Sequence, residues 1–419
     1  MTGFGSYAPG VFLLGLLLPL QLGAKDSCVE CHAGLEGDLT APTQAFTSDV
    51  HQHRGFRCVD CHGGDASVDD PDDSMSPRRG FLGKIRRTDV PKLCARCHSD
   101  AGLIHKFRPQ QRVDQFAQYQ TSVHGKRLVA GDAAAANCVD CHSVHDIREV
   151  KDSRSPVHPL RLPETCARCH ADAAHMAKYK IPTSQFEDYR KSVHWEALAR
   201  RGDLSAPSCA SCHGNHGATP PQVQSVAAVC GTCHALFEDL YSKSPHQPVF
   251  AGMGLAGCVV CHGNHAVLPP SDALLAGPSA VCSQCHEEGS AGGKVGAEMA
   301  RGIASLEAAL KRSGDLLGVA KRSGMEVSEA LLQHHEGQEA LIKARVAVHN
   351  FEVQAVNQPV SDGLKIASQT YEAGQEAMKE RRFRRAGLAV SLLTIVATMA
   401  GLRLAVRSIE GKPKSAADG

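Results

Sequence analysis

Residues 209–216 read Cys-Ala-Ser-Cys-His-Gly-Asn-His and contain the five-residue pattern C-x-x-C-H, around which most of the sequence is organised. The pattern occurs nine times and uses all 18 cysteines of the 419-residue chain. Chance placement of 18 cysteines and 23 histidines would produce roughly 0.04 such matches. The paired cysteines are Cys28/Cys31, Cys58/Cys61, Cys94/Cys97, Cys138/Cys141, Cys166/Cys169, Cys209/Cys212, Cys230/Cys233, Cys258/Cys261 and Cys282/Cys285. The histidines that end the nine patterns are His32, His62, His98, His142, His170, His213, His234, His262 and His286.

The spacing of this pattern matches the attachment of c-type haem. Two thiols three positions apart can form thioethers with the two vinyl groups of one haem, and the histidine that follows binds the iron. Zinc ribbons also use C-x-x-C pairs, but a zinc site does not require a histidine directly after the second cysteine. A disulfide across a two-residue gap closes a strained loop that suits redox exchange rather than stabilisation. The sequence therefore predicts nine covalently bound c-type haems.

The number of haems restricts the fold. Residues 25–290 provide roughly 30 residues for each haem, which is too few to build an independent core around each one. We therefore expect the haems themselves to form the core of a mainly α fold with sparse regular structure, in which short helices carry the motifs. The net charge of +1 excludes an ordinary polybasic nucleic-acid binder, so no nucleic acid is expected as a partner.

Further histidines recur in step with the motifs. A Ser-x-His or similar element precedes a C-x-x-C-H at four places, ending at His51, His124, His194 and His246. Two motifs follow each element, so residues 48–290 are predicted to form four dihaem modules, preceded by one extra haem in residues 25–47. Three motifs extend to Cys-His-x-x-His, which adds His145, His216 and His265. A histidine three residues beyond a proximal ligand cannot easily reach the opposite face of the same iron, but it can reach a neighbouring haem.

These elements give the chain a resemblance to multihaem cytochromes c that carry Ser-x-His and Cys-His-Gly-x-His segments in tandem dihaem modules. The resemblance implies that most haems are low-spin, with histidine on both faces of the iron, and that they pass electrons along a closely spaced chain. It also implies seven distal ligands, namely His51, His124, His145, His194, His216, His246 and His265. The two remaining ligands are expected among His53, His105, His158, His175, His334, His335 and His349, and we favour His175 and His349.

Residues 1–24 are predicted to be a signal peptide. They carry no charged side chain, and the apolar run 11–22 is followed by small residues, as at a secretory cleavage site. An uncleaved anchor is the competing interpretation, but twelve apolar residues are few for a membrane span. Export would place the haem region on the outer side of a bacterial cytoplasmic membrane, facing the periplasm.

The sequence after the last motif has a different composition. Residues 293–382 contain no cysteine and show helical periodicity, which predicts a helical domain with helices over 294–320, 326–356 and 360–406. Pro359 is expected near the start of the third helix. Residues 386–406 are long and apolar enough for a transmembrane helix, and residues 407–419 are predicted to be a cytoplasmic tail. His335 and His349 would lie near one face of the second helix, from which a histidine could bind a terminal haem.

These features predict a membrane-anchored electron-transfer protein without catalytic residues, since a haem with two histidine ligands has no open coordination site. The expected partners are the membrane and redox proteins that link it to quinol, with a cytochrome b or an iron–sulfur subunit as candidates. One rival is an oxidoreductase with a five-coordinate haem, of the nitrite reductase or hydroxylamine oxidoreductase type. The only sequence feature that favours this rival is Gly63-Gly64-Asp65, which occupies the place of the expected histidine in the first module. A third possibility is quinol oxidation by this chain itself.

Overall fold

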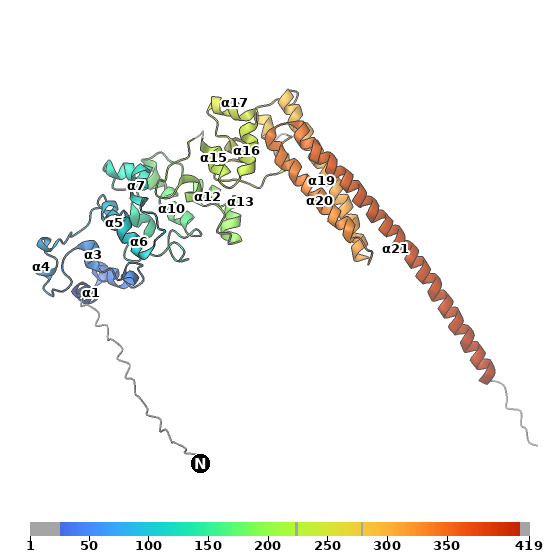
Figure 1. The fold of residues 1–419 in the computed structure, drawn as a ribbon, viewed down its shortest axis with the longest axis horizontal. Helices are drawn as coiled ribbons and strands as arrows, with labels where there is room; N and C mark the ends of the chain where they lie inside the picture. The colour runs from blue at the N-terminus through green and yellow to red at the C-terminus, as the bar shows by residue number, and fades with distance from the viewer. Residues whose placement is uncertain (1–25, 223–224, 278–279, 411–419) are drawn as a thin grey trace, which may run out of the picture. The chain divides into compact units, whose positions relative to one another are not determined.

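The computed structural model describes residues 26–222, 225–277 and 280–410, and all regular elements in these ranges are helical (Figure 1). The mainly α fold predicted from the sequence is therefore confirmed. The predicted signal peptide and most of the predicted tail lie outside the described residues. Two compact units are formed, one from residues up to 183 together with 207–219, and the other from 184–206 and the residues from 220 onward. Motifs one to six therefore lie in the first unit, and motifs seven to nine lie in the second.

The first unit contains only short helices, and most of them carry or flank a motif. They are α1 (Ser27–Ala33), α2 (Ala41–Phe46), α3 (Cys58–His62), α4 (Pro71–Ser74), α5 (Val90–His98), α6 (Ala101–Phe107), α7 (Gln115–Thr121), α8 (Val123–Val129), α9 (Cys138–His142), α10 (Leu162–His170), α11 (Ala173–Ala177) and α14 (Cys209–His213). Three 3₁₀ turns, Gly37–Leu39, Gln52–Arg54 and Pro77–Arg79, connect them.

A motif on its own forms little more than one helical turn, so capping matters. In α9 the side chain of Asn137 accepts the Val139 amide, and Asp140 accepts the Asn137 amide. This reciprocal arrangement satisfies amide groups that a short helix leaves without partners. In α5 and α10 the helix instead begins one turn before the motif, with Pro91 or Pro163 in the first turn, where a missing amide proton costs nothing.

The residue directly after the second, fourth, sixth and eighth motifs has a positive φ. Gly63, Gly214 and Gly263 have φ values of 72°, 77° and 72°, and Ser143 has a φ of 71°. The ψ values lie near 180°, in a region that glycine reaches without strain and other residues do not. The Cys-His-Gly sequence therefore reflects a required backbone turn, and Ser143 occupies that turn at a conformational cost.

The second unit combines short motif helices with three long helices. The short ones are α12 (Gln185–Tyr189), α13 (Val193–Trp195), α15 (Val226–Gly231), α16 (Ala235–Lys243), α17 (His246–Met253) and α18 (Cys258–His262), with a π-helical turn at Glu196–Arg200 and 3₁₀ turns at Asp272–Leu274, Cys282–Gln284 and Val348–Asn350. The long ones are α19 (Ala291–Arg322), α20 (Ser328–Ala347) and α21 (Val353–Glu410).

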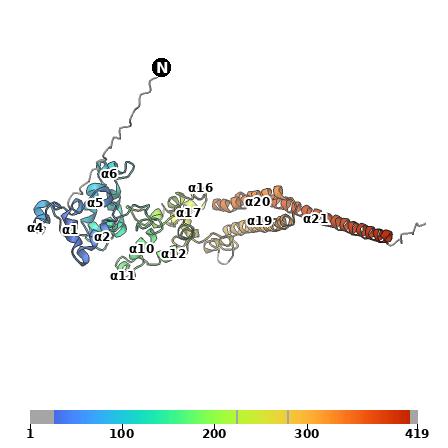
Figure 2. The same cartoon turned by 90° about the horizontal axis from the view of Figure 1, so that it is seen from below.

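The long helices form an antiparallel bundle in which α19 and α20 both pack on α21 (Figures 1 and 2). Two clusters of buried apolar side chains fill it. One contains Ile303, Leu306 and Val356, and the other contains Leu317, Ala320 and Ala377 at the opposite end. The apolar periodicity seen in the sequence is therefore the core of this bundle.

The predicted helix boundaries were wrong at the second turn of the bundle. The second helix ends at Ala347, not at 356, and the third begins at Val353, six residues before Pro359. The buried side chain of Val356 holds this first stretch of α21 in the bundle core ahead of the proline. His349 consequently lies in the turn Val348–Asn350 and does not share a helix face with His335, which is exposed.

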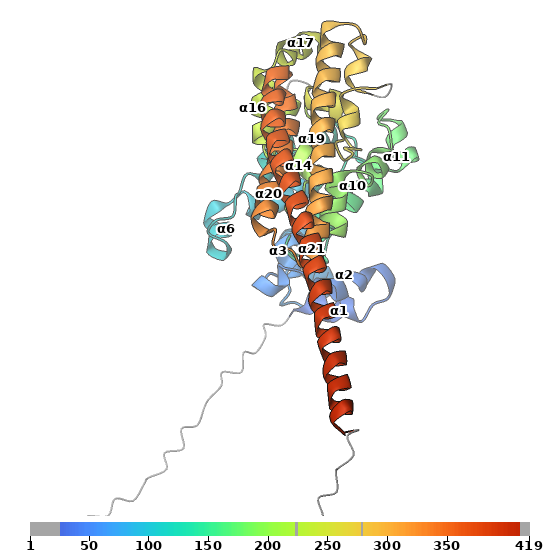
Figure 3. The same cartoon turned by 90° about the vertical axis from the view of Figure 1, so that its right-hand side faces the viewer.

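Beyond the bundle, α21 continues alone (Figures 1 and 3). Every residue from Arg382 to Glu410 is exposed, although this stretch contains an apolar window long enough to cross a membrane. None of that window is buried against the rest of the chain. An apolar helix that packs on nothing in its own chain is suited to lipid, in agreement with the predicted span at 386–406.

The strained turn at Ser143 gives a stability prediction. Replacing Ser143→Gly should raise the stability of the protein by roughly 1–3 kcal/mol, because glycine adopts this backbone conformation without strain. The matched change Gly214→Ala, at the equivalent position of another motif, should lower stability. The thermal unfolding midpoints of the two variants measure the effect, and a lower midpoint for Ser143→Gly would contradict the assignment of strain.

Candidate haem sites

The motif cysteines are placed for attachment rather than for cross-linking. All 18 lie within the described ranges, none forms a disulfide, and each is at least partly exposed. Within a motif helix the two cysteines are separated by nearly one turn, and the histidine ends the helix, as in α3, α9, α14 and α18. The two thiols of each motif are therefore at least partly accessible to a group that would attach there.

The two cysteines of a motif differ in exposure. The first cysteine of every motif is partly buried, whereas the second is exposed in five motifs. The spacing alone treats the two thiols as equivalent, so the structure adds a distinction that the sequence did not predict. Exposure is compatible with attachment, because a thioether forms only where the vinyl group can reach the sulfur. The role of these exposed residues as haem-binding cysteines remains a prediction. They are Cys31, Cys61, Cys212, Cys233 and Cys285.

At least seven of the proximal histidines face a second histidine ring. An iron held by two imidazoles separates the ring centres by about 6 Å, given metal–nitrogen bonds of about 2 Å. The observed centroid separations fit this value and leave room for one iron between the rings. The pairs are His62/His145 (6.0 Å), His142/His216 (6.0 Å), His262/His349 (6.1 Å), His51/His98 (6.0 Å), His124/His170 (6.1 Å), His246/His286 (6.0 Å) and His194/His234 (6.4 Å).

The Cys-His-x-x-His histidines reach back across two motifs. His145, in the fourth motif, faces His62 of the second, and His216, in the sixth, faces His142 of the fourth. The ring planes in these pairs are nearly parallel, at 20° and 11°. His62 thus has an imidazole opposite it, although Gly63-Gly64-Asp65 follows it. That replacement is no sign of an open haem at the second motif.

Each Ser-x-His histidine faces the proximal histidine of the second motif that follows it in the sequence. Ser122 and Ser192 explain why serine precedes these histidines, since each is buried and caps the short helix that carries the histidine. The Ser122 hydroxyl donates to Tyr119 O (2.6 Å) and accepts the Gly125 amide (2.9 Å). Ser192 makes the same two bonds, to Tyr189 O and from the Trp195 amide. The serine therefore fixes the start of the helix and with it the position of the distal histidine.

In the first module a buried aspartate has this positioning role. His51 Nδ1 donates to Asp49 (2.9 Å), which leaves Nε2 for the iron. Asp49 also accepts the Ile147 amide (2.7 Å). Burial would raise the pKa of the Asp49 carboxyl, but the bonds from the His51 side chain and from the Ile147 and His51 amides outweigh burial and lower it. The carboxylate stays charged and orients the imidazole.

One backbone hydrogen bond repeats between the two kinds of element. The residue before the distal histidine of a Ser-x-His element donates its amide to a carbonyl two residues after a Cys-His-x-x-His. The three examples are Val50 to Ile147 (2.8 Å), Val123 to Ala218 (3.2 Å) and Val193 to Val267 (2.9 Å). The bond places the two predicted distal histidines of each set side by side. His265 occupies the same place in this arrangement as His145 and His216, and its role as a distal ligand remains a prediction.

The helical domain contributes His349, which faces His262 with nearly parallel rings, at 14°. The turn between α20 and α21 presents it, and Phe237 packs edge-on against it at 4.9 Å. Two positions later, Phe351 lies against His246 at 3.9 Å. The sequence placed His349 among the candidates, but the turn that aims it was not predictable from helical periodicity.

The remaining candidates have other contacts. His53 donates Nε2 to Thr47 O and His105 donates Nε2 to Gln111 O, both at 3.1 Å, so the nitrogen that would bind iron is occupied. His334 is buried in the bundle, where Nε2 donates to Leu310 O (3.0 Å). His158 is also buried and accepts the Leu160 amide (3.3 Å). His175 contacts Tyr179, while the neighbouring His170 faces His124, so a role of His175 as ligand rests on the sequence alone.

Burial favours the neutral form of several imidazoles in these pairs by lowering their pKa values. The pKa of His142 is lowered to about 4, first by burial and then by the nearby His216 and His98. Burial likewise lowers the pKa of His62 and His262. Neutral imidazole is the form that binds a metal, so these sites are prepared for iron at neutral pH.

The cysteines of successive motifs lie near one another. In the first unit the side chains of Cys94 and Cys138 interact directly, as do those of Cys166 and Cys209. The same contact joins Cys230 and Cys258 in the second unit. Electrostatic interactions between thiols connect the intervening steps, namely Cys28/Cys58, Cys61/Cys94, Cys141/Cys169 and Cys261/Cys282. Groups attached at these cysteines would therefore be neighbours along motifs one to six and along motifs seven to nine.

Comparison with known proteins agrees with this geometry. The cytochrome c3 family matches residues 50–171 and 203–287. The chain is also similar to the C-type polyheme cytochrome OmcC of Geobacter sulfurreducens, with 24% identity over 209 residues, which are 45% of this chain and 26% of that protein. The chain thus spans about a quarter of the length of this relative. No solved structure matches.

The motifs, the paired histidines and these matches define the class of the protein. They support a multihaem c-type cytochrome, with a cytochrome c3-like domain over residues 50–171 and 203–287. The residues fit the haem that this class implies, because each facing pair leaves the space of one iron beside the two thiols of a motif. When bound, haem supplies one-electron redox chemistry.

The pairing gives a direct prediction about ligation. Replacing His124→Ala should convert one haem to high spin, because its iron loses the ligand opposite His170. The control His158→Ala should leave the low-spin count unchanged, since that buried histidine contacts backbone rather than a proximal imidazole. Electron paramagnetic resonance of the oxidised proteins measures both, and a new high-spin signal in the His158 variant alone would overturn the assignment.

Proposed function

We propose that the chain is a membrane-anchored, extracytoplasmic electron conduit with nine c-type haems. The observation that supports it most is that cysteines of successive motifs interact within each unit, three pairs directly and the others electrostatically. Haems attached in this way lie close enough for electrons to pass from one to the next. With histidine on both faces of the iron, such haems exchange electrons and bind no substrate.

The membrane arrangement is part of the same proposal. The exposed apolar end of α21 anchors the protein, and export by the N-terminal signal places the haem region in the periplasm. Arg381, Arg382, Arg384 and Arg385 precede the apolar stretch and are suited to lipid headgroups. The partners are redox proteins of a quinol-linked chain, for which a cytochrome b or an iron–sulfur subunit is the natural kind.

A haem count with a truncated control tests the proposal. The full-length protein should contain nine haems by the pyridine haemochrome assay. Nine haems at about 0.62 kDa each should also add about 5.5 kDa to the mass of the mature chain. The full-length protein should stay in the membrane fraction after a high-salt wash, whereas a truncation before Arg381 should be soluble and keep all nine haems. Seven or fewer haems in mature protein, or a truncated form that remains in the membrane, would contradict the proposal.

The surroundings of His32 favour a second function at one haem. Its Nδ1 donates to Leu39 O (3.3 Å), which leaves Nε2 for iron, but no second histidine ring lies opposite it among the described residues. The spare histidines of the same unit, His53 and His105, direct Nε2 to backbone carbonyls. The haem of the first motif would then bind small exogenous ligands, as the oxidoreductase alternative requires.

Carbon monoxide distinguishes the two functions. If the haem at His32 is open, the reduced protein should bind one equivalent of carbon monoxide, and Cys28→Ala with Cys31→Ala should remove that binding together with one haem. The matched pair Cys94→Ala with Cys97→Ala should remove one haem and leave the binding intact. Absence of carbon monoxide binding in the parent protein would leave the conduit as the only function.

A further inference from the structure

The second unit contains a fixed link between haem sites and the membrane anchor. At one end of the bundle, the turn after α20 aims His349 at His262 and packs Phe351 on His246. At the other end, α21 runs on without a break into the exposed apolar stretch. One continuous helix therefore joins the ligand of a haem to the segment that would lie in lipid.

This link is rigid rather than a flexible tether. The two buried apolar clusters pack α21 along its length, from Val356 near the haem sites to Ala377. At the haem end, Arg345 of α20 makes two hydrogen bonds to Asp272, at 3.1 and 2.7 Å, in the loop between the last two motifs. A planar guanidinium bound in this way fixes both the distance and the orientation of α20 relative to the turn that contains Asp272. The bundle and the last haem sites thus move as one body.

The length of the link follows from helix geometry. Residues 353–385 of α21 separate the ligand turn from the apolar segment, which at 1.5 Å per residue is about 50 Å. A tilt of about 40°, the largest that transmembrane helices commonly show, still leaves about 38 Å. Residues 291–410 contain no cysteine, so no haem attaches along this distance. Electron tunnelling through protein falls exponentially with distance and cannot cross such a span at a useful rate.

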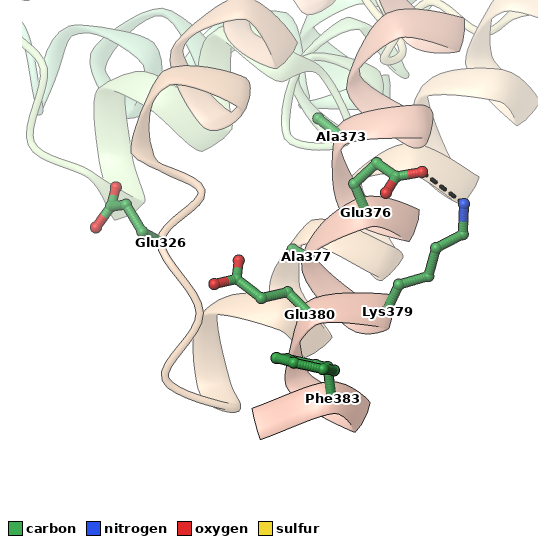
Figure 4. A pocket seen from close by; sticks show the side chains of 7 residues that line it. All are labelled: Glu326, Ala373, Glu376, Ala377, Lys379, Glu380 and Phe383. Carbon is green, nitrogen blue, oxygen red and sulfur yellow. Dashed lines mark hydrogen bonds and ion pairs between the residues drawn. The ribbon is translucent and has the colours of Figure 1, made fainter. Parts of the chain in front are cut away.

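A cavity near the foot of the bundle does not shorten the path. It has a volume of about 600 Å³, and its lining residues are Glu326, Ala373, Glu376, Ala377, Lys379, Glu380 and Phe383 (Figure 4). Its residues on α21 lie about 28 positions beyond His349, or about 40 Å along the helix. A quinol held there would be as isolated from the haem at His262 as one in the bilayer.

We propose that the three-helix domain is a spacer that holds the haems of motifs seven to nine out of reach of lipid-dissolved quinol. These haems therefore exchange electrons with a protein partner whose own redox centre stands above the membrane at that height. The inference rests on the proposed function, because it assumes a bilayer around residues 386–406. It excludes the third possibility raised by the sequence, direct quinol oxidation, for this end of the haem chain.

Two donors with the same headgroup chemistry test the spacer. Full-length holoprotein in liposomes is mixed either with menadiol, which dissolves in water, or with a long-chain menaquinol confined to the bilayer. Reduction of the haems, followed by their absorbance, should be more than two orders of magnitude slower with the confined quinol. Similar rates for the two donors would overturn the proposal.

Truncation before Arg381 provides the matched variant. The released protein can bring its haems to the vesicle surface, so the confined quinol should reduce it faster than it reduces the anchored protein. Slower reduction of the truncated form would show that the anchor delivers the haems to quinol, and would overturn the spacer. Failure of the proposed function is a different result, namely haems that dithionite does not reduce or a full-length protein that does not enter vesicles.

Discussion

The pairing of imidazoles from distant parts of the sequence, at the separation that one iron requires, is the constraint on which the haem region depends. His62 and His145, or His51 and His98, are far apart in sequence and meet only across the space of a haem. Few apolar side chains are buried around them, with Leu128 and Leu198 among the exceptions. Bound haems would provide both the core and the contacts between successive motifs. Such a fold would depend on its haems, in agreement with its sparse regular structure.

The helical domain has a core of side chains instead of cofactors. Its core is made of ordinary apolar side chains on three amphipathic helices, and it needs no cofactor to pack. The two kinds of core meet at His349, where a turn of the bundle supplies an imidazole to the haem region. The bundle therefore contacts the paired histidines at one end and continues into the exposed apolar stretch of α21 at the other. In the function proposed above, this continuity fixes the position of the last haems relative to the membrane.

Much of this arrangement could be predicted from the sequence, because haem attachment needs two cysteines and a histidine at one fixed spacing. The periodic Ser-x-His and Cys-His-x-x-His elements also indicated most of the histidines that face a motif histidine. The sequence could not show which motif each histidine serves, since that depends on contacts such as Val50 with Ile147. It misplaced the helix containing His349, because buried Val356 starts α21 before Pro359. It also gave no sign that His334 is a core residue bonded to Leu310.

The central claim is that facing histidine pairs are the axial ligands of the haems. Near-infrared magnetic circular dichroism of the fully oxidised, full-length protein tests it most directly, because its charge-transfer band reports the two axial ligands of each low-spin haem. The account predicts that at least seven haems per chain show the band of two histidine ligands, one for each facing pair. A spectrum in which histidine–methionine or high-spin haems make up the majority would contradict it.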